Sequence, residues 1–131
     1  MGEVNHLLDT HALLWWLFDD PRLSATSKGV LRDPHVRIFV SSASAWEIST
    51  KHRLGRLAAA TPLVRDFPGW LDRAGFTELP ITSIHAMRAG SWDTSHRDPF
   101  DRMLAAQSVT EGLRLVSRDP VFSEFGLDPL W

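Results

Sequence analysis

The chain has 131 residues, a formal net charge of −2 and no cysteine. A chain of this length forms one domain and buries roughly 65–70% of its unfolded surface, so it needs no disulfide or structural metal for stability. The lack of cysteine excludes disulfides and thiolate metal sites, and it suits a reducing cytoplasm. The net charge argues against a protein that coats nucleic acid by charge alone, but not against a nuclease. We expect one cytoplasmic domain over residues 1–131.

The longest apolar stretch, residues 12–18, is far shorter than the ~20 residues of a membrane span. Glu3 and Asp9 interrupt the start of the chain, where a signal peptide would need a basic segment followed by an apolar one. We therefore expect no membrane association.

The first half of the chain alternates between short apolar runs and helical patterns. In chain order it predicts a strand over 4–8, a helix over 12–18, a helix over 25–31 capped by Ser24, a strand over 36–40, and a helix that begins near 41–44 and runs to about 54–55.

The second half continues this alternation. It predicts a helix over 62–74 ended by Gly75, a strand over 76–81, a short helix to about 89 capped by Thr82 or Ser83, a helix over 99–111 ended by Gly112, a strand over 113–116, and a short edge strand in the tail, 122–131. Strands alternating with helices predict an α/β fold with a mostly parallel sheet covered on both sides. The spacing does not give the strand order.

Acidic residues stand where apolar runs end or helices begin: Asp9, Glu47, Asp98, Asp101 and Asp119. In an open parallel sheet these places lie along one edge, where ligands bind. Carboxylates gathered there repel one another unless a hard divalent cation such as Mg²⁺ or Mn²⁺ neutralises them. The pattern predicts a metal-dependent enzyme that acts on a phosphate substrate.

Each acid also has an ordinary structural interpretation. Asp9 and Asp98 are suitable helix caps, and Pro99 suits the first helical position. Glu47 can pair with Lys51 four residues later, and Asp119 can serve in a turn before a proline. It is their joint placement that favours a shared site.

Two basic residues near this group are candidates for positioning an acid or contacting phosphate. Arg102 is expected to pair with Asp98, four residues earlier, and to hold its orientation. His96 is a candidate for contact with phosphate, whereas the other histidines lack metal-ligand spacing.

Four motifs together resemble PIN-domain proteins: Leu-Leu-Asp9-Thr-His, Ser-Ala-Trp-Glu47-Ile, His-Arg-Asp98-Pro-Phe-Asp101-Arg and Leu-Val-Ser-Arg-Asp119. More narrowly, the chain resembles the VapC toxins of bacterial toxin–antitoxin pairs, in the branch with the His-Arg-Asp-Pro-Phe-Asp-Arg signature. The resemblance covers essentially the whole chain in the right order. Residues 91–95 depart from the lead-in that the family has before this signature.

The resemblance implies a three-layer α/β/α sandwich whose acidic pocket binds Mg²⁺, with Mn²⁺ as a substitute, and cleaves RNA to leave a 5′-phosphate and a 3′-hydroxyl. It assigns Asp9, Glu47 and Asp119 as ligands. The third acid is Asp101 by the match of the helix that follows it, with Asp98 as an additional or capping acid. The implied partners are an RNA substrate and a small antitoxin of VapB type, in a homodimer or a toxin–antitoxin hetero-oligomer.

Two other interpretations remain open. The first keeps the fold as a non-catalytic PIN-like binding domain, with the acids used for structure or for docking a basic partner. The second is an aspartyl-phosphate phosphohydrolase with Asp9 as the nucleophile. His11 weakens the second interpretation, because it stands where that chemistry usually places another acid.

Overall fold

A computed structural model describes residues 5–131; Val4, predicted to begin the first strand, lies outside the described residues. The described strands form one parallel sheet in the order β3-β2-β1-β4. Their bounds are β1 (His6–Leu8), β2 (Ile38–Ser41), β3 (Thr77–Leu79) and β4 (Arg114–Val116).

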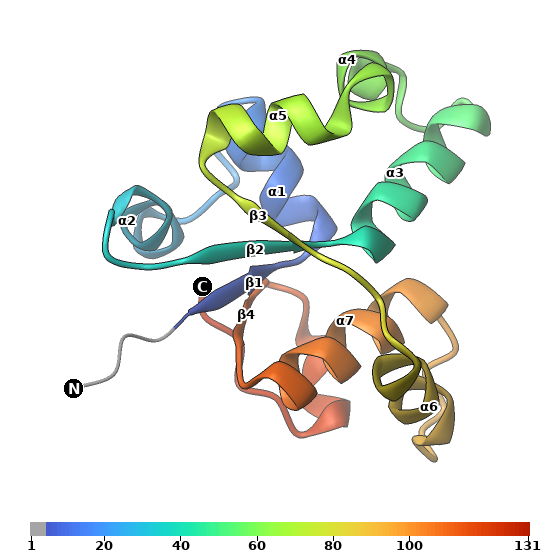
Figure 1. Ribbon diagram of the computed structural model, residues 1–131. Helices are drawn as coiled ribbons and strands as arrows, with labels where there is room; N and C mark the ends of the chain where they lie inside the picture. Colours follow the sequence, from blue (N-terminus) through green and yellow to red (C-terminus); the bar gives the residue numbers. More distant parts are fainter. Residues whose placement is uncertain (1–4) are drawn as a thin grey trace.

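Helices cover both faces of the sheet (Figure 1). One layer contains α1 (Thr10–Leu17), α2 (Ala25–Arg32), α3 (Ser42–Arg53), the 3₁₀ turn η1 (Ala58–Ala60), α4 (Thr61–Arg65) and α5 (Phe67–Ala74). The other contains α6 (Ser83–Ser91), α7 (Pro99–Glu111) and the 3₁₀ helix η2 (Pro120–Phe125). The predicted three-layer α/β/α architecture with a parallel sheet is confirmed.

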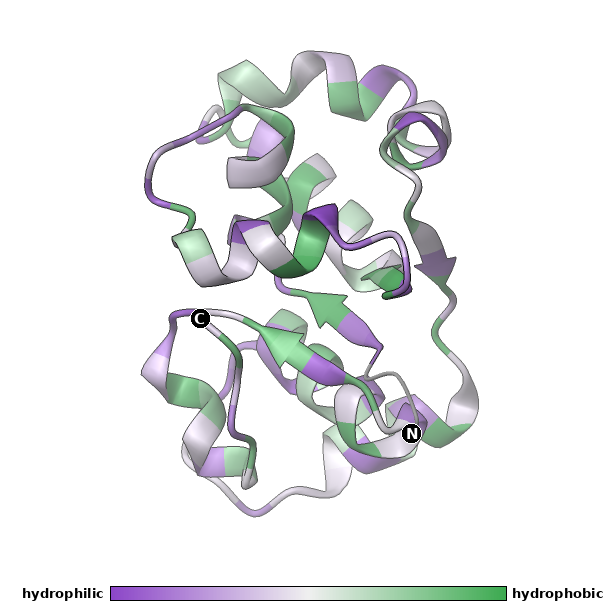
Figure 2. Cartoon of the chain, turned by 90° about the vertical axis from the view of Figure 1, so that its left-hand side faces the viewer, coloured by the Kyte–Doolittle hydropathy of each residue, from purple (hydrophilic) through white to green (hydrophobic). Residues whose placement is uncertain are grey.

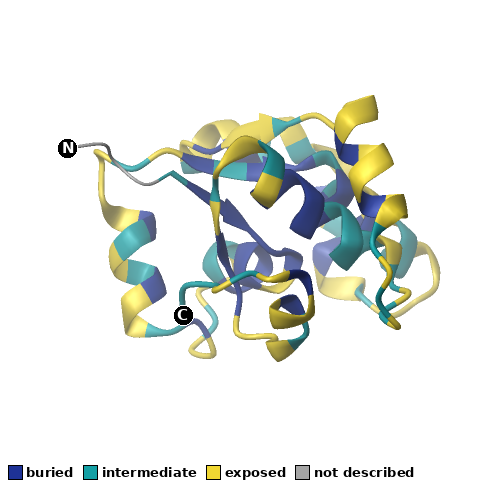
Figure 3. Cartoon of the chain, turned by 90° about the horizontal axis from the view of Figure 1, so that it is seen from below, coloured by how far each residue is buried: buried dark blue, intermediate teal, exposed yellow. Residues whose placement is uncertain are grey.

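Alternation along the strands separates two hydrophobic cores. Leu8 and Val116 pack with α1 to α5, whereas Leu7 and Leu115 pack with α7 and η2. Successive side chains of a strand point to opposite faces, so a strand covered on both sides must be apolar throughout. Figure 2 shows hydrophobic residues in the central strands between the two helical layers, and Figure 3 shows these strands buried in the middle of the molecule. The edge strand β3 differs, because its Thr77 and Glu78 are exposed.

Most predicted helix ends are confirmed by their caps. Ser24 caps α2 by accepting from the Ser27 amide, and Thr82 caps α6. Gly112 ends α7 with a positive φ of 65°, a conformation that glycine adopts without steric cost. The predicted bounds of α7, 99–111, are those observed.

Two predicted elements are wrong. The helix expected over 62–74 is broken at Asp66, because Pro68 has no amide hydrogen to continue the helical ladder and the Asp66 carboxylate instead caps a new helix at Gly69, at 3.1 Å. The edge strand expected over 122–131 is replaced by η2, since Phe122 and Phe125 bury one helical face. Leu130, near the end of the tail, forms a single isolated β-bridge with Val116.

No helix in residues 5–131 is long and apolar enough to cross a membrane.

Candidate functional site

The order in which the chain adds strands to the sheet reverses at β1, because β2 and β3 lie on one side of it and β4 lies on the other. In open α/β sheets ligands bind at such a point, in the crevice outside the carboxyl ends of the strands. Asp9 directly follows β1, and its backbone N donates to the Val116 carbonyl at the end of β4 at 3.1 Å. Asp119 follows β4 and begins η2. The fold therefore brings the first and last predicted acids to one crevice.

Asp9 is buried, with 7% of its surface exposed, and it caps α1. Its Oδ1 accepts from the Ala12 amide at 2.7 Å. Burial raises the pKa of Asp9 to about 6, although hydrogen bonds from Ser117 and Ala12 oppose the shift, and the charge of Asp101 raises it further. The surroundings of Asp9 therefore do not balance its negative charge.

Glu47 lies in α3 with 5% of its surface exposed. The Thr10 hydroxyl donates to its Oε1 at 2.6 Å, and the Lys51 Nζ donates to its Oε2 at 2.5 Å. The predicted pairing of Glu47 with Lys51 is confirmed, and the carboxylate is also enclosed by the protein. Both of its carboxylate oxygens have a partner on the protein.

Asp98 caps α7, as predicted, by accepting from the amides of Phe100 at 2.8 Å and Asp101 at 3.3 Å. The Asp101 Oδ2 lies 2.9 Å from the His96 Nε2. Burial raises the pKa of Asp101; the His96 bond opposes this, and the charges of Asp98 and Glu47 add to it. Asp101 thus lies within the electrostatic reach of three other acids, since it also acts on Asp9.

The predicted pairing of Arg102 with Asp98 is wrong. The Arg102 guanidinium donates instead to three backbone carbonyls, those of Ala89 at 2.8 Å, His96 at 2.8 Å and Trp92 at 2.6 Å. A planar fork of five donors can satisfy several carbonyls at once, and one Asp98 oxygen already caps α7. Arg102 therefore ties the end of α6 and the loop that carries His96 to α7.

Asp119 is exposed, and it differs in this from Asp9 and Glu47. Its Oδ1 accepts from the Val121 amide at 3.0 Å. It lines a hollow of about 390 Å³ whose wall also includes Asp9. Asp119 stands at the rim of the acidic group rather than inside it.

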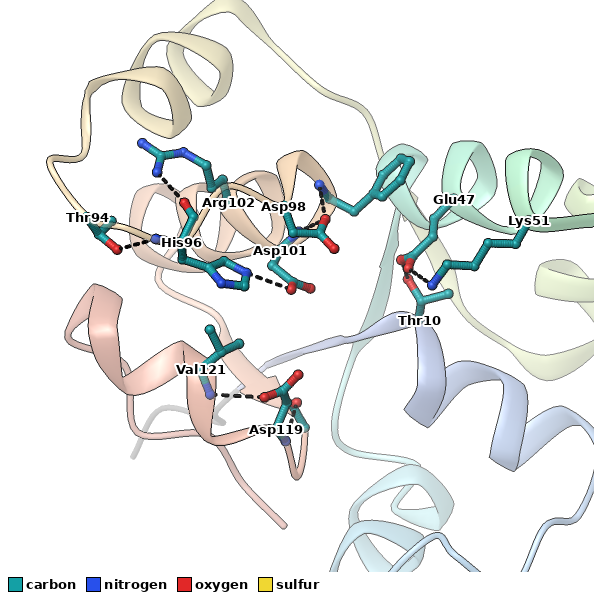
Figure 4. A network of polar contacts seen from close by, with 12 residues as sticks. Thr10, Glu47, Lys51, Thr94, His96, Asp98, Asp101, Arg102, Asp119 and Val121 are labelled. Carbon is teal, nitrogen blue, oxygen red and sulfur yellow. Dashed lines mark hydrogen bonds and ion pairs between the residues drawn. The ribbon is translucent and has the colours of Figure 1, made fainter. Parts of the chain in front are cut away.

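Figure 4 shows how these side chains lie: the carboxylates of Glu47, Asp101 and Asp119 come from different elements and face a common space. Within residues 5–131, no three acidic or histidine side chains are gathered closely enough to hold a metal ion. Lys51 and His96 instead occupy oxygens of Glu47 and Asp101. Binding one ion through several of these acids therefore requires their side chains to turn toward it.

The donor set fits a hard divalent cation. It consists of carboxylate oxygens, which Mg²⁺ and Mn²⁺ prefer. The raised pKa values of Asp9 and Asp101 identify the carboxylates whose ionised form lacks compensation. A cation placed between them would supply that compensation.

Hydroxyl groups support the acids, and the sequence did not single them out for this role. Thr10 Oγ1 lies 3.0 Å from Ser44 Oγ and also reaches Glu47, so α1 and α3 are joined beside the site. Ser117 bonds both Asp9 and the backbone N of Asp119. Thr10 and Ser117 stand close to acids that follow strand ends in the sequence, and this position could have identified them as supporting residues.

Comparisons with known proteins agree on one family. The family model described as PIN domain matches residues 6–127. Ribonuclease VapC16 of Mycobacterium tuberculosis is 33% identical over 84 residues, which cover 59% of this chain and 60% of that protein. Ribonuclease VapC22 of the same organism is 28% identical over 116 residues, covering 86% of this chain and 85% of the relative.

Two solved structures share the fold. VapBC2 from Rickettsia felis, bound to a DNA fragment from its promoter, aligns with a TM-score of 0.69 at 12% identity, over 97% of this chain and 98% of that one. VapC20 of Mycobacterium tuberculosis, a toxin that cleaves the sarcin-ricin loop, aligns with a TM-score of 0.65 at 20% identity, over 95% and 97%.

Proposed function

The chain belongs to the PIN domain family, and we propose that it is a Mg²⁺- or Mn²⁺-dependent endoribonuclease, the toxin of a toxin–antitoxin pair. The relatives VapC16 and VapC22 are named as ribonucleases. The observation that carries the proposal is the gathering of acids at the crevice, where buried Asp9 lines a hollow with Asp119 and lies within the electrostatic reach of Asp101. Such carboxylates suit a divalent cation that in turn binds a phosphodiester.

In this proposal Asp9, Glu47 and Asp101 hold the cation. Asp119 adds an oxygen from the rim, and Asp98 contributes next to Asp101. A cation held there would supply positive charge to the scissile phosphate and would lower the pKa of the attacking water. Hydrolysis of the P–O3′ bond then leaves a 5′-phosphate and a 3′-hydroxyl.

Three neighbouring side chains position the ligands. His96 orients Asp101 through the 2.9 Å contact of its Nε2. Lys51 and Thr10 hold the Glu47 carboxylate. Release of Glu47 by Lys51, and of Asp101 by His96, would free an oxygen of each for the cation, and both basic groups would remain near the phosphate.

The proposal includes partners. Three solved structures with this fold are VapBC2 from Rickettsia felis, a toxin–antitoxin complex from Klebsiella pneumoniae, and FitAcB from Neisseria gonorrhoeae. By analogy, this chain acts on RNA in the cytoplasm, pairs with a small antitoxin of VapB type that suppresses it, and self-associates.

Incubation of antitoxin-free protein with total cellular RNA tests the activity. We expect discrete fragments with Mg²⁺ or Mn²⁺, none with EDTA, and none from an Asp101→Asn variant. Asp72→Asn is the matched control, because Asp72 is an exposed residue of α5 outside the acidic group. Intact RNA under all conditions would favour a non-catalytic PIN-like binding domain.

A further inference from the structure

A second group of side chains lies beside the acids. The hollow of about 390 Å³ that contains Asp9 and Asp119 is also lined by Trp15, His11, Arg22 and Arg118. These residues come from α1, from the segment after it and from the segment after β4. We call this space the Trp15 hollow. The proposed hydrolysis uses its two acids and leaves its basic side unexplained.

The buried ring of Trp15 organises the basic side of the hollow. The Arg118 guanidinium carbon lies 4.6 Å from the Trp15 ring centroid, and that of Arg22 lies 4.9 Å from it. The His11 ring stacks on Trp15 at 5.6 Å between centroids. A guanidinium held over an aromatic ring is attracted to its face without using its N–H groups. The cations are therefore ordered while their donors remain available.

Arg22 is fixed a second time, by Asp20. Its Nε donates to Asp20 Oδ1 at 3.1 Å and its Nη2 donates to Oδ2 at 2.7 Å. These bonds, followed by the charges of Arg22 and Arg118, lower the pKa of Asp20 to about 2. Arg22 is therefore mostly committed to Asp20, with its Nη1 left over.

Arg118 is not committed in this way. In the part of the chain that the structure describes, no hydrogen bond or ion pair engages its guanidinium, and the residue is exposed at the rim of the hollow. It stands one residue before Asp119. An ordered guanidinium with five free donors matches the oxygens of a phosphate.

We propose that the Trp15 hollow binds a phosphate of the RNA strand adjacent to the scissile one, with Arg118 as its main ligand and Arg22 and His11 beside it. This subsite rests on the proposed function. A strand carries one phosphate per nucleotide, so a strand whose scissile phosphate reaches Asp9 presents its next phosphate close by. The basic side also offsets the repulsion between the acids and a polyanion.

Binding of a short fluorescent single-stranded RNA, measured by anisotropy over a salt series, tests the subsite. The protein carries Asp101→Asn throughout, so that the RNA stays intact. Adding Arg118→Gln should weaken binding about tenfold and should reduce the slope of log K against log salt by about 0.7, the value for one phosphate contact on a single strand. Arg65→Gln is the matched control, because Arg65 is exposed at the end of α4; we expect its Kd to stay within about twofold.

Arg118→Lys separates a phosphate ligand from a packing role. The lysine keeps the charge, so Arg118→Lys should retain most of the salt slope. If Arg118 only packs on Trp15, Arg118→Lys should weaken RNA binding as much as Arg118→Gln does. Equal binding by the Arg118→Gln and Arg65→Gln proteins, while the wild type cleaves RNA, would overturn the subsite and leave the proposed function standing. A wild type that neither binds nor cleaves RNA would overturn both. If Arg118→Gln weakens only the binding of an acidic peptide, the hollow is a protein-docking site and the proposal is wrong.

Discussion

Arg102 and His96 are joined by a hydrogen bond from the Arg102 Nη1 to the His96 carbonyl at 2.8 Å, while the His96 ring lies 2.9 Å from Asp101. α7 therefore holds His96 at both its backbone and its side chain. Arg102 thus acts on the loop before the helix and His96 acts on Asp101, whereas Asp98 and Asp101 form the start of the helix.

Replacing Arg102 by methionine should destabilise the protein. The change keeps much of the side-chain length but removes three charge-assisted hydrogen bonds and leaves the carbonyls of Ala89, Trp92 and His96 without this donor. We expect a loss of about 2–4 kcal/mol in the free energy of unfolding, measured by urea denaturation. Arg97→Met is the control, since Arg97 is the exposed neighbour of the same loop. Equal stability of the two variants would contradict the role assigned to Arg102.

Replacing Asp9 by asparagine should stabilise the metal-free protein near neutral pH. The pKa of Asp9 is raised from 3.8 to about 6, so folding favours its protonated form. That stabilising contribution is complete below pH 3.8 and is lost as the pH rises through 6. Ionised Asp9 then costs up to about 3 kcal/mol at pH 7.5. The asparagine removes this cost and can still accept from Ala12.

We expect Asp9→Asn in EDTA to raise the free energy of unfolding by roughly 1–3 kcal/mol at pH 7.5 and to have little effect at pH 4. Urea denaturation at both pH values measures this difference. The control Asp72→Asn, which alters an exposed carboxylate, should show no such pH dependence. An Asp9→Asn protein that is less stable at pH 7.5 than at pH 4, relative to the wild type, would contradict the inferred burial of charge.

Mg²⁺ should raise the stability of the wild type, and this increase should depend more on Asp101 than on Asp119. At a concentration of 100 times Kd a bound ligand adds about 2.7 kcal/mol, which thermal denaturation with and without EDTA can detect. Asp101→Asn should abolish most of the increase in Tm, because Asp101 acts electrostatically on Asp9 and is acted on by Glu47 and Asp98. Asp119→Asn should retain more of it, because Asp119 is exposed. Equal losses from the two variants would place Asp119 among the central ligands.

The elements were predictable where local signals decide them. Asp98, Pro99 and Gly112 mark the two ends of α7, and both were found there. The same logic failed over 62–74, because the apolar pattern continues through Asp66 while Pro68 breaks the hydrogen-bond ladder. In the tail, burial of Phe122 and Phe125 against α7 outweighed strand propensity.

Side-chain partners were less predictable than positions. Asp9, Glu47 and Asp101 could be placed near one edge from strand ends and helix starts. The bonds of Arg102 could not, because they depend on where the loop before α7 passes, which spacing does not encode. The order β3-β2-β1-β4, which creates the crevice, also could not be predicted from the spacing of the strands in the sequence.

The most direct test of the central claim is cleavage of an end-labelled single-stranded RNA, with the product ends mapped. The account predicts cleavage by the wild type in Mg²⁺ to give 5′-phosphate and 3′-hydroxyl ends, and no cleavage in EDTA or by the folded Asp101→Asn variant. Cleavage that persists in EDTA, or in Asp101→Asn at the rate of the Asp72→Asn control, would contradict a metal-dependent nuclease centred on these acids.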